Sequence, residues 1–230
     1  MHNQYIIEVS KLTKVFGRFI ALDGIDLAIY KGEIFGLVGP NGAGKSTFIS
    51  ILSTVCKPTG GEVYIKSINL KKHPGRIKKL IGYVPQDIAL YPMLTGLDNL
   101  DFWAGIYGLK GELKKERIKE ALSVVKMEDR AQDRVETYSG GMKRRLNIAV
   151  SLMHHPEILI MDEPTVGVDI QSRKYILEGI KDLKSRGRTV VFTSHYLDDM
   201  KDLCDRIAII DKGSIKDAGP VDELLSKYGG

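Results

Sequence analysis

The stretch Gly39-Pro40-Asn41-Gly42-Ala43-Gly44-Lys45-Ser46-Thr47 has the glycine, lysine and hydroxyl spacing of loops that hold nucleotide phosphates. An apolar, strand-like run precedes it at residues 34–38, and residues 47–52 are typical of the opening of a helix. An ordinary glycine-rich turn is the alternative, but such a turn seldom also supplies the lysine, the hydroxyl and both flanking elements. The stretch therefore predicts a phosphate-binding loop, or P-loop, whose nine residues bind a nucleotide.

The side chains of this loop suit distinct tasks. Glycines allow successive backbone N–H groups to turn toward the β-phosphate at a helix N-terminus. Lys45 adds charge to the β- and γ-phosphates, and Ser46 offers its hydroxyl to Mg²⁺. We therefore expect Lys45 to serve catalysis as well as binding.

A pair of adjacent carboxylates, Asp162 and Glu163, follows the apolar run at residues 158–161. Two acids at the carboxyl end of a strand suit Mg²⁺ chemistry, with Asp162 holding the metal shell and Glu163 accepting a proton from an attacking water. A strand that merely ends in a charged turn is the alternative. The P-loop elsewhere in the chain favours the metal and general-base roles.

The pattern of elements predicts an α/β fold with a P-loop NTPase core and a mainly parallel sheet. Strand-like runs alternate with amphipathic segments, and the later runs lie at residues 80–84, 158–162, 189–193 and 206–211. Short β-rich pieces before residue 30 and at 62–65 predict a small antiparallel subdomain. Residues 114–127 show helical periodicity in a region without strand signals. We expect one domain, 1–230, with the β subdomain and core at 1–86 and 153–230 and an inserted helical subdomain at 87–152.

The composition is that of a globular protein with a substantial core. The 230 residues are 43% hydrophobic and 27% charged, and the net charge of +5 permits a phosphate-rich partner without requiring one. Apolar runs are far shorter than the roughly 18 residues that span a bilayer, and no secretory signal is evident. Cys56 and Cys204 form no metal-binding or disulfide framework. These features lead us to expect a cytoplasmic protein.

A second turn, Ser139-Gly140-Gly141, precedes a helical apolar pattern, and Ser139 can cap that helix. Backbone N–H groups at such an N-terminus form a further anion site. Here the sequence resembles the ATP-binding-cassette (ABC) ATPases, whose signature has this core, with Tyr138 and Met142 where leucine and glutamine are common. The resemblance implies that the signature of one subunit closes on the nucleotide held by another, in an ATP-sandwich dimer with a second copy or a homologous subunit.

The resemblance covers essentially the whole chain and implies four further roles. Phe16 matches the aromatic that stacks on adenine, Gln86 the residue that senses Mg²⁺ and the γ-phosphate, and His195 the switch histidine at the γ-phosphate. Asp169 matches the loop that crosses the dimer interface. From the residues alone there are alternatives: Phe16 could be a core residue, which we consider less favoured than stacking, Gln86 could be a solvent-facing amide, and His195 could be structural. Together with Ser46 and Asp162, Gln86 would complete the magnesium site.

The sequence of the signature region resembles that of cassettes that serve export permeases of the second ABC type. Lys143-Arg144-Arg145 follows the signature, and we interpret it as a solvated face rather than a nucleic-acid patch. In this family a membrane subunit docks near residues 86–107, where Tyr91, Phe102 and Trp103 would suit a groove or, equally, the subdomain core.

The expected function is therefore the ATPase subunit of an ABC transporter, with ATP and Mg²⁺ as cofactors and a separate polytopic permease as partner. Such a subunit would sit on the cytoplasmic face of the membrane through that permease, and its role would be export. Two alternatives remain: a soluble cassette ATPase acting on nucleic acid or the ribosome, and a regulatory nucleotide switch without turnover. The absence of a second cassette or a long coiled-coil insertion disfavours the former, and Glu163 and His195 disfavour the latter.

Overall fold

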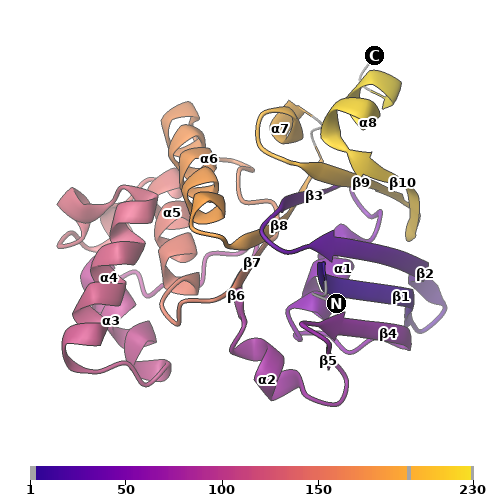
Figure 1. Cartoon of the computed structure of the whole chain (residues 1–230). Helices are drawn as coiled ribbons and strands as arrows, with labels where there is room; N and C mark the ends of the chain where they lie inside the picture. Colours follow the sequence, from indigo (N-terminus) through magenta and orange to yellow (C-terminus); the bar gives the residue numbers. More distant parts are fainter. Residues whose placement is uncertain (1–3, 196–197, 229–230) are drawn as a thin grey trace.

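The computed structural model of the chain describes residues 4–195 and 198–228, which form two sheets and a group of helices (Figure 1). The larger sheet has the strand order β10-β9-β3-β8-β7-β6, and the smaller has the order β2-β1-β4-β5. The strands of the larger sheet are β3 (Ile34–Val38), β6 (Ile81–Val84), β7 (Ile158–Met161), β8 (Thr189–Ser194), β9 (Arg206–Asp211) and β10 (Ser214–Pro220). Those of the smaller sheet are β1 (Tyr5–Phe16), β2 (Phe19–Tyr30), β4 (Gly60–Ile65) and β5 (Ile68–Asn69).

The larger sheet is parallel from β9 through β6, and only β10 pairs antiparallel, with β9. Its central strands are apolar on both faces because both faces are covered. Alternate residues divide between two cores. Leu159 and Met161 face the helices α4 (Gly111–Val125), α5 (Gly140–Ser151) and α6 (Ile170–Ser185), whereas Ile158 and Ile160 face α1 (Lys45–Leu52) and the smaller sheet. The alternation places one strand in contact with two separate hydrophobic clusters.

The carboxyl ends of the parallel strands bring four loops to one edge of the sheet. In register, Val38 of β3 lies beside Ser194 of β8, and Met161 of β7 pairs with Phe192 of β8 and Val84 of β6. The P-loop, the Asp162–Glu163 pair, His195 and Gln86 each follow one of these ends. Ligands of open α/β sheets bind at such an edge.

The helices α3, α4 and α5 gather on one side of the larger sheet, with α6 beside them, and the antiparallel strands lie on the other side (Figure 1). Thr95 and Asp98 form a capping box at the start of α3, which fixes where that helix begins. Helix α4 carries Ile118, Ala121 and Leu122 on one buried face. The helices are α2 (Pro74–Lys78), α3 (Gly96–Ile106), α4 (Gly111–Val125), α5 (Gly140–Ser151), α6 (Ile170–Ser185), α7 (Asp198–Lys201) and α8 (Val221–Tyr228), with short 3-10 turns at Glu128–Arg130 and Val135–Thr137.

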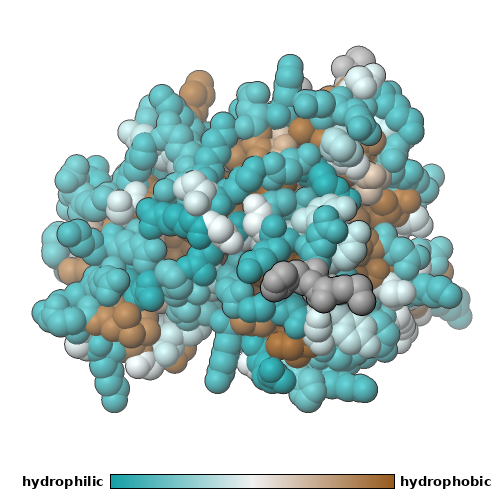
Figure 2. Space-filling view, in the orientation of Figure 1, coloured by the Kyte–Doolittle hydropathy of each residue, from teal (hydrophilic) through white to brown (hydrophobic). Residues whose placement is uncertain are grey.

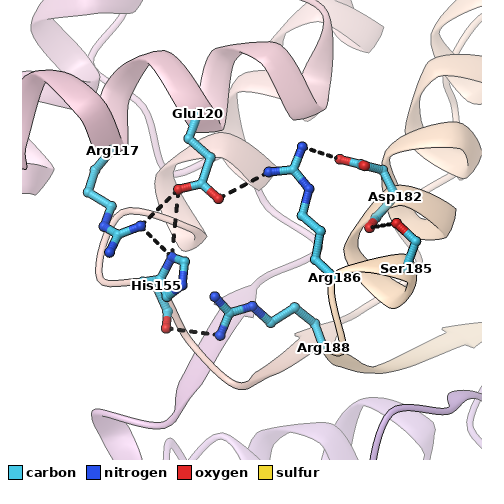
Figure 3. Close-up of polar contacts among 7 residues, drawn as sticks. All are labelled: Arg117, Glu120, His155, Asp182, Ser185, Arg186 and Arg188. Carbon is cyan, nitrogen blue, oxygen red and sulfur yellow. Dashed lines mark hydrogen bonds and ion pairs between the residues drawn. The ribbon is translucent and has the colours of Figure 1, made fainter.

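A polar cluster joins α4, the end of α6 and the loop before β7 (Figure 3). Glu120 of α4 pairs with Arg117 at 2.9 Å and with Arg186 at 3.1 Å. Arg117 lies 2.6 Å from Nδ1 of His155, and Arg188 donates to the carbonyl of His155 at 3.4 Å. Burial alone would raise the pKa of Glu120, but the hydrogen bond from Arg117 and the surrounding positive charges hold it below its usual range.

The predicted fold class is confirmed, with differences in detail. The first two strands are each twelve residues long, longer than the β-rich pieces seen in the sequence, because β1 pairs with both β2 and β4. The edge strand β10 was not predicted, since its polar residues give no apolar run. Among the described residues, no helix combines the length and apolar character needed to cross a bilayer.

Candidate functional site

The P-loop connects β3 to α1 in a backbone conformation that glycine favours. Gly42 and Gly44 have φ values of 80° and 108°, a region that other residues rarely adopt. A Cβ on Gly44 would lie 2.6 Å from the carbonyl oxygen of Ala21, so a larger residue is excluded sterically as well. Gly44 is also the N-cap residue of α1, whose first turn holds no acid. The first N–H groups of α1 are therefore available to an anion.

A cavity of about 510 Å³ lies against this loop, and all four residues predicted to be catalytic line it. Its walls come from the P-loop, the hairpin between β1 and β2, and the loops after β6, β7 and β8. The lining residues are Phe19, Ala21, Asn41, Gly42, Gly44, Lys45, Ser46, Thr47, Gln86, Glu163, Val166 and His195. Residues as far apart in sequence as Phe19 and His195 thus share one pocket, which has the size that small ligands occupy.

Lys45 is the buried cation of the pocket. Its ammonium donates to the carbonyl oxygens of Gly39 at 2.7 Å and Pro40 at 3.1 Å, and it lies 3.4 Å from Oε1 of Glu163. Gly39 and Pro40 are not among the lining residues, but their carbonyl oxygens fix the position of the Lys45 ammonium. Gly39 is also confined by packing, because an added Cβ would lie 2.1 Å from the carbonyl oxygen of Ile210. Ala43, which was predicted as part of the nucleotide site, is a buried residue of the loop and packs into the hydrophobic core.

Glu163 faces both a cation and an imidazole. Nδ1 of His195 lies 3.5 Å from the same carboxylate oxygen that faces Lys45. The backbone of Glu163 has a φ of 47°, in the left-handed region. A strained backbone at a ligand-binding edge is a recurrent property of functional sites.

Thr193 of β8 holds the acid pair in place. Its hydroxyl donates to Oδ1 of Asp162 at 2.7 Å and accepts the backbone N–H of Glu163 at 2.9 Å. Both acids and Thr193 are buried. Sequence reasoning missed Thr193, and the only signal for it was its place beside Ser194 and His195 at the end of a strand.

The signature residues lie together at the start of two helices. Ser139 accepts the backbone N–H of Met142 at 3.2 Å, so the predicted cap of α5 is confirmed. A Cβ on Gly141 would lie 2.2 Å from Oγ of Ser172 and 2.6 Å from Oδ2 of Asp169, whereas one on Gly140 would meet nothing within 4 Å. The two helices α5 and α6 are therefore in close contact at their N-termini.

Asp169 caps α6 by accepting the backbone N–H of Ser172 at 2.8 Å, and this bond is the main cause that lowers the pKa of Asp169. The signature residues and Asp169 are not among the residues that line the P-loop cavity of the same chain. Ser139, Gly140 and Asp169 are exposed outside that cavity, with Gly141 buried beside them, and we call these residues the signature surface.

The predicted adenine-stacking residue, Phe16, lies at the tip of the β1–β2 hairpin, directly opposite Phe19. Phe16 is 50% exposed, so it is not a core residue, and the ammonium of Lys14 lies 4.5 Å from its ring centroid. Phe19, which is 62% exposed, lines the cavity, and Phe16 does not. Sequence reasoning overlooked Phe19 because a single aromatic at a hairpin tip has no distinctive spacing.

The interpretation of Lys143-Arg144-Arg145 as a solvated face was wrong for both arginines. Arg144 and Arg145 are only 7% and 8% exposed. Arg144 donates to the carbonyls of Pro85 and Gln86, and Arg145 to those of Val125 and Lys126. Buried arginines of this kind satisfy backbone acceptors, and they are not available as a nucleic-acid patch.

The predicted aromatic groove is divided between surface and core. The rings of Tyr91 and Phe102 meet edge to face at 4.9 Å, and both residues are more than 40% exposed. Trp103 packs against the core beneath them. A cavity of about 560 Å³ lies between α3 and α4, and the space-filling view shows a hydrophobic patch over these helices at its lower left (Figure 2).

The fold and the site define a P-loop nucleotide-binding cassette. A family model described as "ABC transporter" matches residues 22–166. The linearmycin resistance ATP-binding protein LnrL of Bacillus subtilis is 48% identical over 98% of this chain and 72% of its own length. The Nod factor export ATP-binding protein I of Cupriavidus pinatubonensis is 35% identical over 97% of this chain and 69% of its own length.

Solved structures agree with this assignment. A dimeric ATP-binding cassette in a post-hydrolysis state, bound to ADP and Pi, superposes with a TM-score of 0.83 at 30% identity, over 94% of this chain and 98% of the other. The chain belongs to the ABC transporter family, and its fold is that of an ABC ATPase cassette.

Proposed function

We propose that this chain is the subunit that binds and hydrolyses ATP in an ABC exporter and drives a separate membrane permease. The observation that carries the proposal is the single cavity where the P-loop meets Gln86, Glu163 and His195. The names of the relatives, which speak of drug resistance and of export, support the direction of transport. The chain would then lie on the cytoplasmic face of the membrane.

Nucleotide binding rests on the P-loop. The N–H groups of the first turn of α1 would receive the phosphate oxygens, and Lys45 would turn its ammonium from the carbonyls of Gly39 and Pro40 toward the terminal phosphates. At the hairpin tip, Phe16 and Phe19 pair directly across the two strands and both are exposed, so they would offer aromatic surface to the base.

The residues fit a magnesium ion. Ser46 and Gln86 bring oxygen atoms to the cavity, and Asp162 has one carboxylate oxygen fixed by Thr193, which leaves the other for the hydrated metal. Bound there, Mg²⁺ would neutralise charge that develops on the β- and γ-phosphate oxygens. Among the described residues no group of three or more His, Cys, Asp and Glu side chains gathers for a metal, and Mg²⁺ chelated mainly by phosphates requires no such cage.

Hydrolysis would use Glu163 as the acceptor of a proton from the attacking water. Its carboxylate already lies between Lys45 and His195, so both neighbours can stabilise its charge and fix its orientation. His195 and Gln86 would contact the γ-phosphate. Catalysis of phosphoryl transfer depends mainly on such positioning and electrostatics.

The signature residues would act on the nucleotide of a partner subunit. Ser139, Gly140 and Gly141 form an N-terminus that the chain's own cavity does not include, and Asp169 lies beside them. A head-to-tail dimer, with a second copy or a homologous subunit, would place this surface against the partner's P-loop. Because ATP would then contact both subunits, it would favour the closed state.

The permease would dock on the helical side. We propose that residues 87–152 form a helical subdomain beside a β subdomain and core at 1–86 and 153–230, whose outer ends, 1–3 and 229–230, lie outside the described residues. Tyr91 and Phe102 offer exposed aromatic surface there, close to Gln86 in sequence. Aromatic residues of this kind anchor interfaces.

The proposal is tested by capturing the complex. Tagged Glu163→Gln chain is expressed in its native cells, trapped with ATP and purified after gentle solubilisation of membranes, with Lys45→Ala as the matched control that cannot be trapped. We expect a multi-spanning membrane protein to co-purify with the Glu163→Gln chain. Ribosomes or nucleic acid without a membrane partner would overturn the transporter assignment.

A further inference from the structure

The cavity and the signature surface of one chain are joined by a buried arginine. Arg144 lies on the second turn of α5, the helix that Ser139 caps. One of its guanidinium nitrogens donates to the carbonyl of Pro85 at 2.8 Å and the other to that of Gln86 at 2.6 Å. The planar fork of arginine holds two acceptors in a fixed geometry, which lysine cannot do.

A second contact from the same face of α5 extends this attachment. Asn147, three residues after Arg144, accepts the backbone N–H of Ala89 at 3.2 Å and donates to the carbonyl of Asp87 at 3.4 Å. Asn147 is almost fully buried. Two neighbouring side chains of α5 therefore hold the backbone of residues 85–89 over a sequence separation of about 60 residues.

The held segment includes a residue of the cavity. Gln86 lines the cavity with its side chain, while its carbonyl is held by Arg144. About one turn before Arg144, α5 begins at Ser139 and Gly141, which are not among the residues that line that cavity. Because a helix is stiff over three turns, a displacement of Gln86 by ligand would be carried to the N-terminus of α5.

We propose that Arg144 is a positioning residue that ties the backbone of Gln86 to α5, so that nucleotide sensed in one chain's cavity sets the placement of that chain's signature surface. The inference rests on the proposed function of this cavity. Arg144 is not among the residues that line the cavity, so it acts through Gln86 and through α5.

Arg145 provides a matched control. It is the next residue on α5, it is buried to the same degree, and it also donates to two backbone carbonyls. Its acceptors, Val125 and Lys126, lie at the end of α4 and not in the segment that carries Gln86. Loss of either arginine removes a buried charge and two hydrogen bonds, but of the two only Arg144 is bonded to a residue that lines the cavity.

The test compares Arg144→Gln with Arg145→Gln. ATP affinity is measured with a fluorescent ATP analogue, turnover by phosphate release, and ATP-dependent dimerisation by light scattering in the Glu163→Gln background. Hydrogen exchange of residues 85–92 reports the state of the held segment. We expect Arg144→Gln to keep its ATP affinity within about twofold, and to lose at least about fivefold in kcat and in ATP-dependent dimerisation, at the lower end of typical coupling effects.

Three results decide the matter. The proposal is supported if Arg144→Gln, and not Arg145→Gln, shows faster hydrogen exchange at residues 85–92 and loses kcat and ATP-dependent dimerisation. Wild-type kcat and wild-type dimerisation in Arg144→Gln would overturn it, and so would equal losses of these two quantities in both variants. If Arg144→Gln does not fold, Asn147→Leu removes the second contact and must show the same pattern. The chain without the arginine substitutions is measured first. If it neither hydrolyses ATP nor dimerises with ATP, the result counts against the proposed function as a whole, and not only against the role of Arg144.

Discussion

The ammonium of Lys45 lies 3.4 Å from the carboxylate of Glu163, and both side chains are buried in the wall of one cavity. Their opposite charges stabilise each other, and each would meet a different part of a bound nucleotide. The two residues can therefore be separated by mutation.

Glu163→Gln should slow ATP hydrolysis by about 10²- to 10⁴-fold, the usual contribution of a general base. ATP affinity should be preserved or improved, because the change removes a negative charge near the phosphates and leaves Lys45 in place. Phosphate release and equilibrium ATP binding measure the two effects. Hydrolysis at the wild-type rate would disprove the assignment of Glu163 as the base.

Lys45→Ala should reduce both nucleotide affinity and turnover, because the lysine stabilises the ground state and the transition state of the phosphates. Isothermal titration with ATP and a steady-state assay give the two values. Lys79→Ala, an exposed lysine after α2, is the control for net charge. If Lys45→Ala bound ATP as tightly as Lys79→Ala, the cavity would not be the nucleotide site.

Thr193→Val should destabilise the fold by about 1–3 kcal/mol, because it leaves the buried Asp162 carboxylate and the N–H of Glu163 without a partner. Activity at saturating ATP should fall as well, since the acid pair loses its support. Thr193→Ser keeps the hydroxyl and should be much closer to wild type. Urea unfolding of both variants checks the prediction, and a Thr193→Val variant at least as stable as Thr193→Ser would contradict the role of the hydroxyl.

Gly141→Ala should destabilise the chain, because its Cβ would overlap Ser172 and Asp169 at the start of α6. Gly140→Ala has open space at the same helix terminus and should change the stability of the monomer by no more than about 0.5 kcal/mol. Thermal unfolding of the two variants makes the comparison. A destabilised Gly140→Ala beside a stable Gly141→Ala would contradict the close contact of α5 with α6.

His155 should make stability decrease as the pH falls. Burial lowers the pKa of its imidazole, the charges of Arg188 and Arg117 lower it further, and Glu120 opposes the shift (Figure 3). Between this lowered value and the ordinary histidine pKa of about 6.5, the unfolded chain binds more protons than the folded one, so acid favours unfolding.

His155→Asn should remove this part of the pH dependence, and asparagine tolerates the positive φ of 56° at this position. Urea unfolding at pH 7.5 and pH 5.5 measures the difference, with His73→Asn, an exposed histidine, as control. A wild type and a His155→Asn variant with parallel pH profiles would show that His155 does not contribute.

The sequence by itself determined the features that lie within a few consecutive residues. The P-loop is one continuous stretch with its strand and helix on either side, and its glycines mark the positions where the backbone turns. The cap of α5 by Ser139 and the acid pair after β7 are equally local. The alternation of apolar strand-like runs with amphipathic segments was enough to predict the fold class, because strands buried on both faces require helices or sheets on either side of the sheet.

Only the tertiary structure decided which side chains meet across the chain. Thr193 reaches Asp162 because β7 and β8 are neighbours in register, and Arg144 reaches Gln86 because α5 packs against the loop after β6. In sequence, Arg144 and Arg145 resembled a solvated charge run, since nothing nearby shows which backbone carbonyls they satisfy. The physical reason is that burial and partner choice depend on contacts between residues far apart in sequence, which local periodicity does not encode.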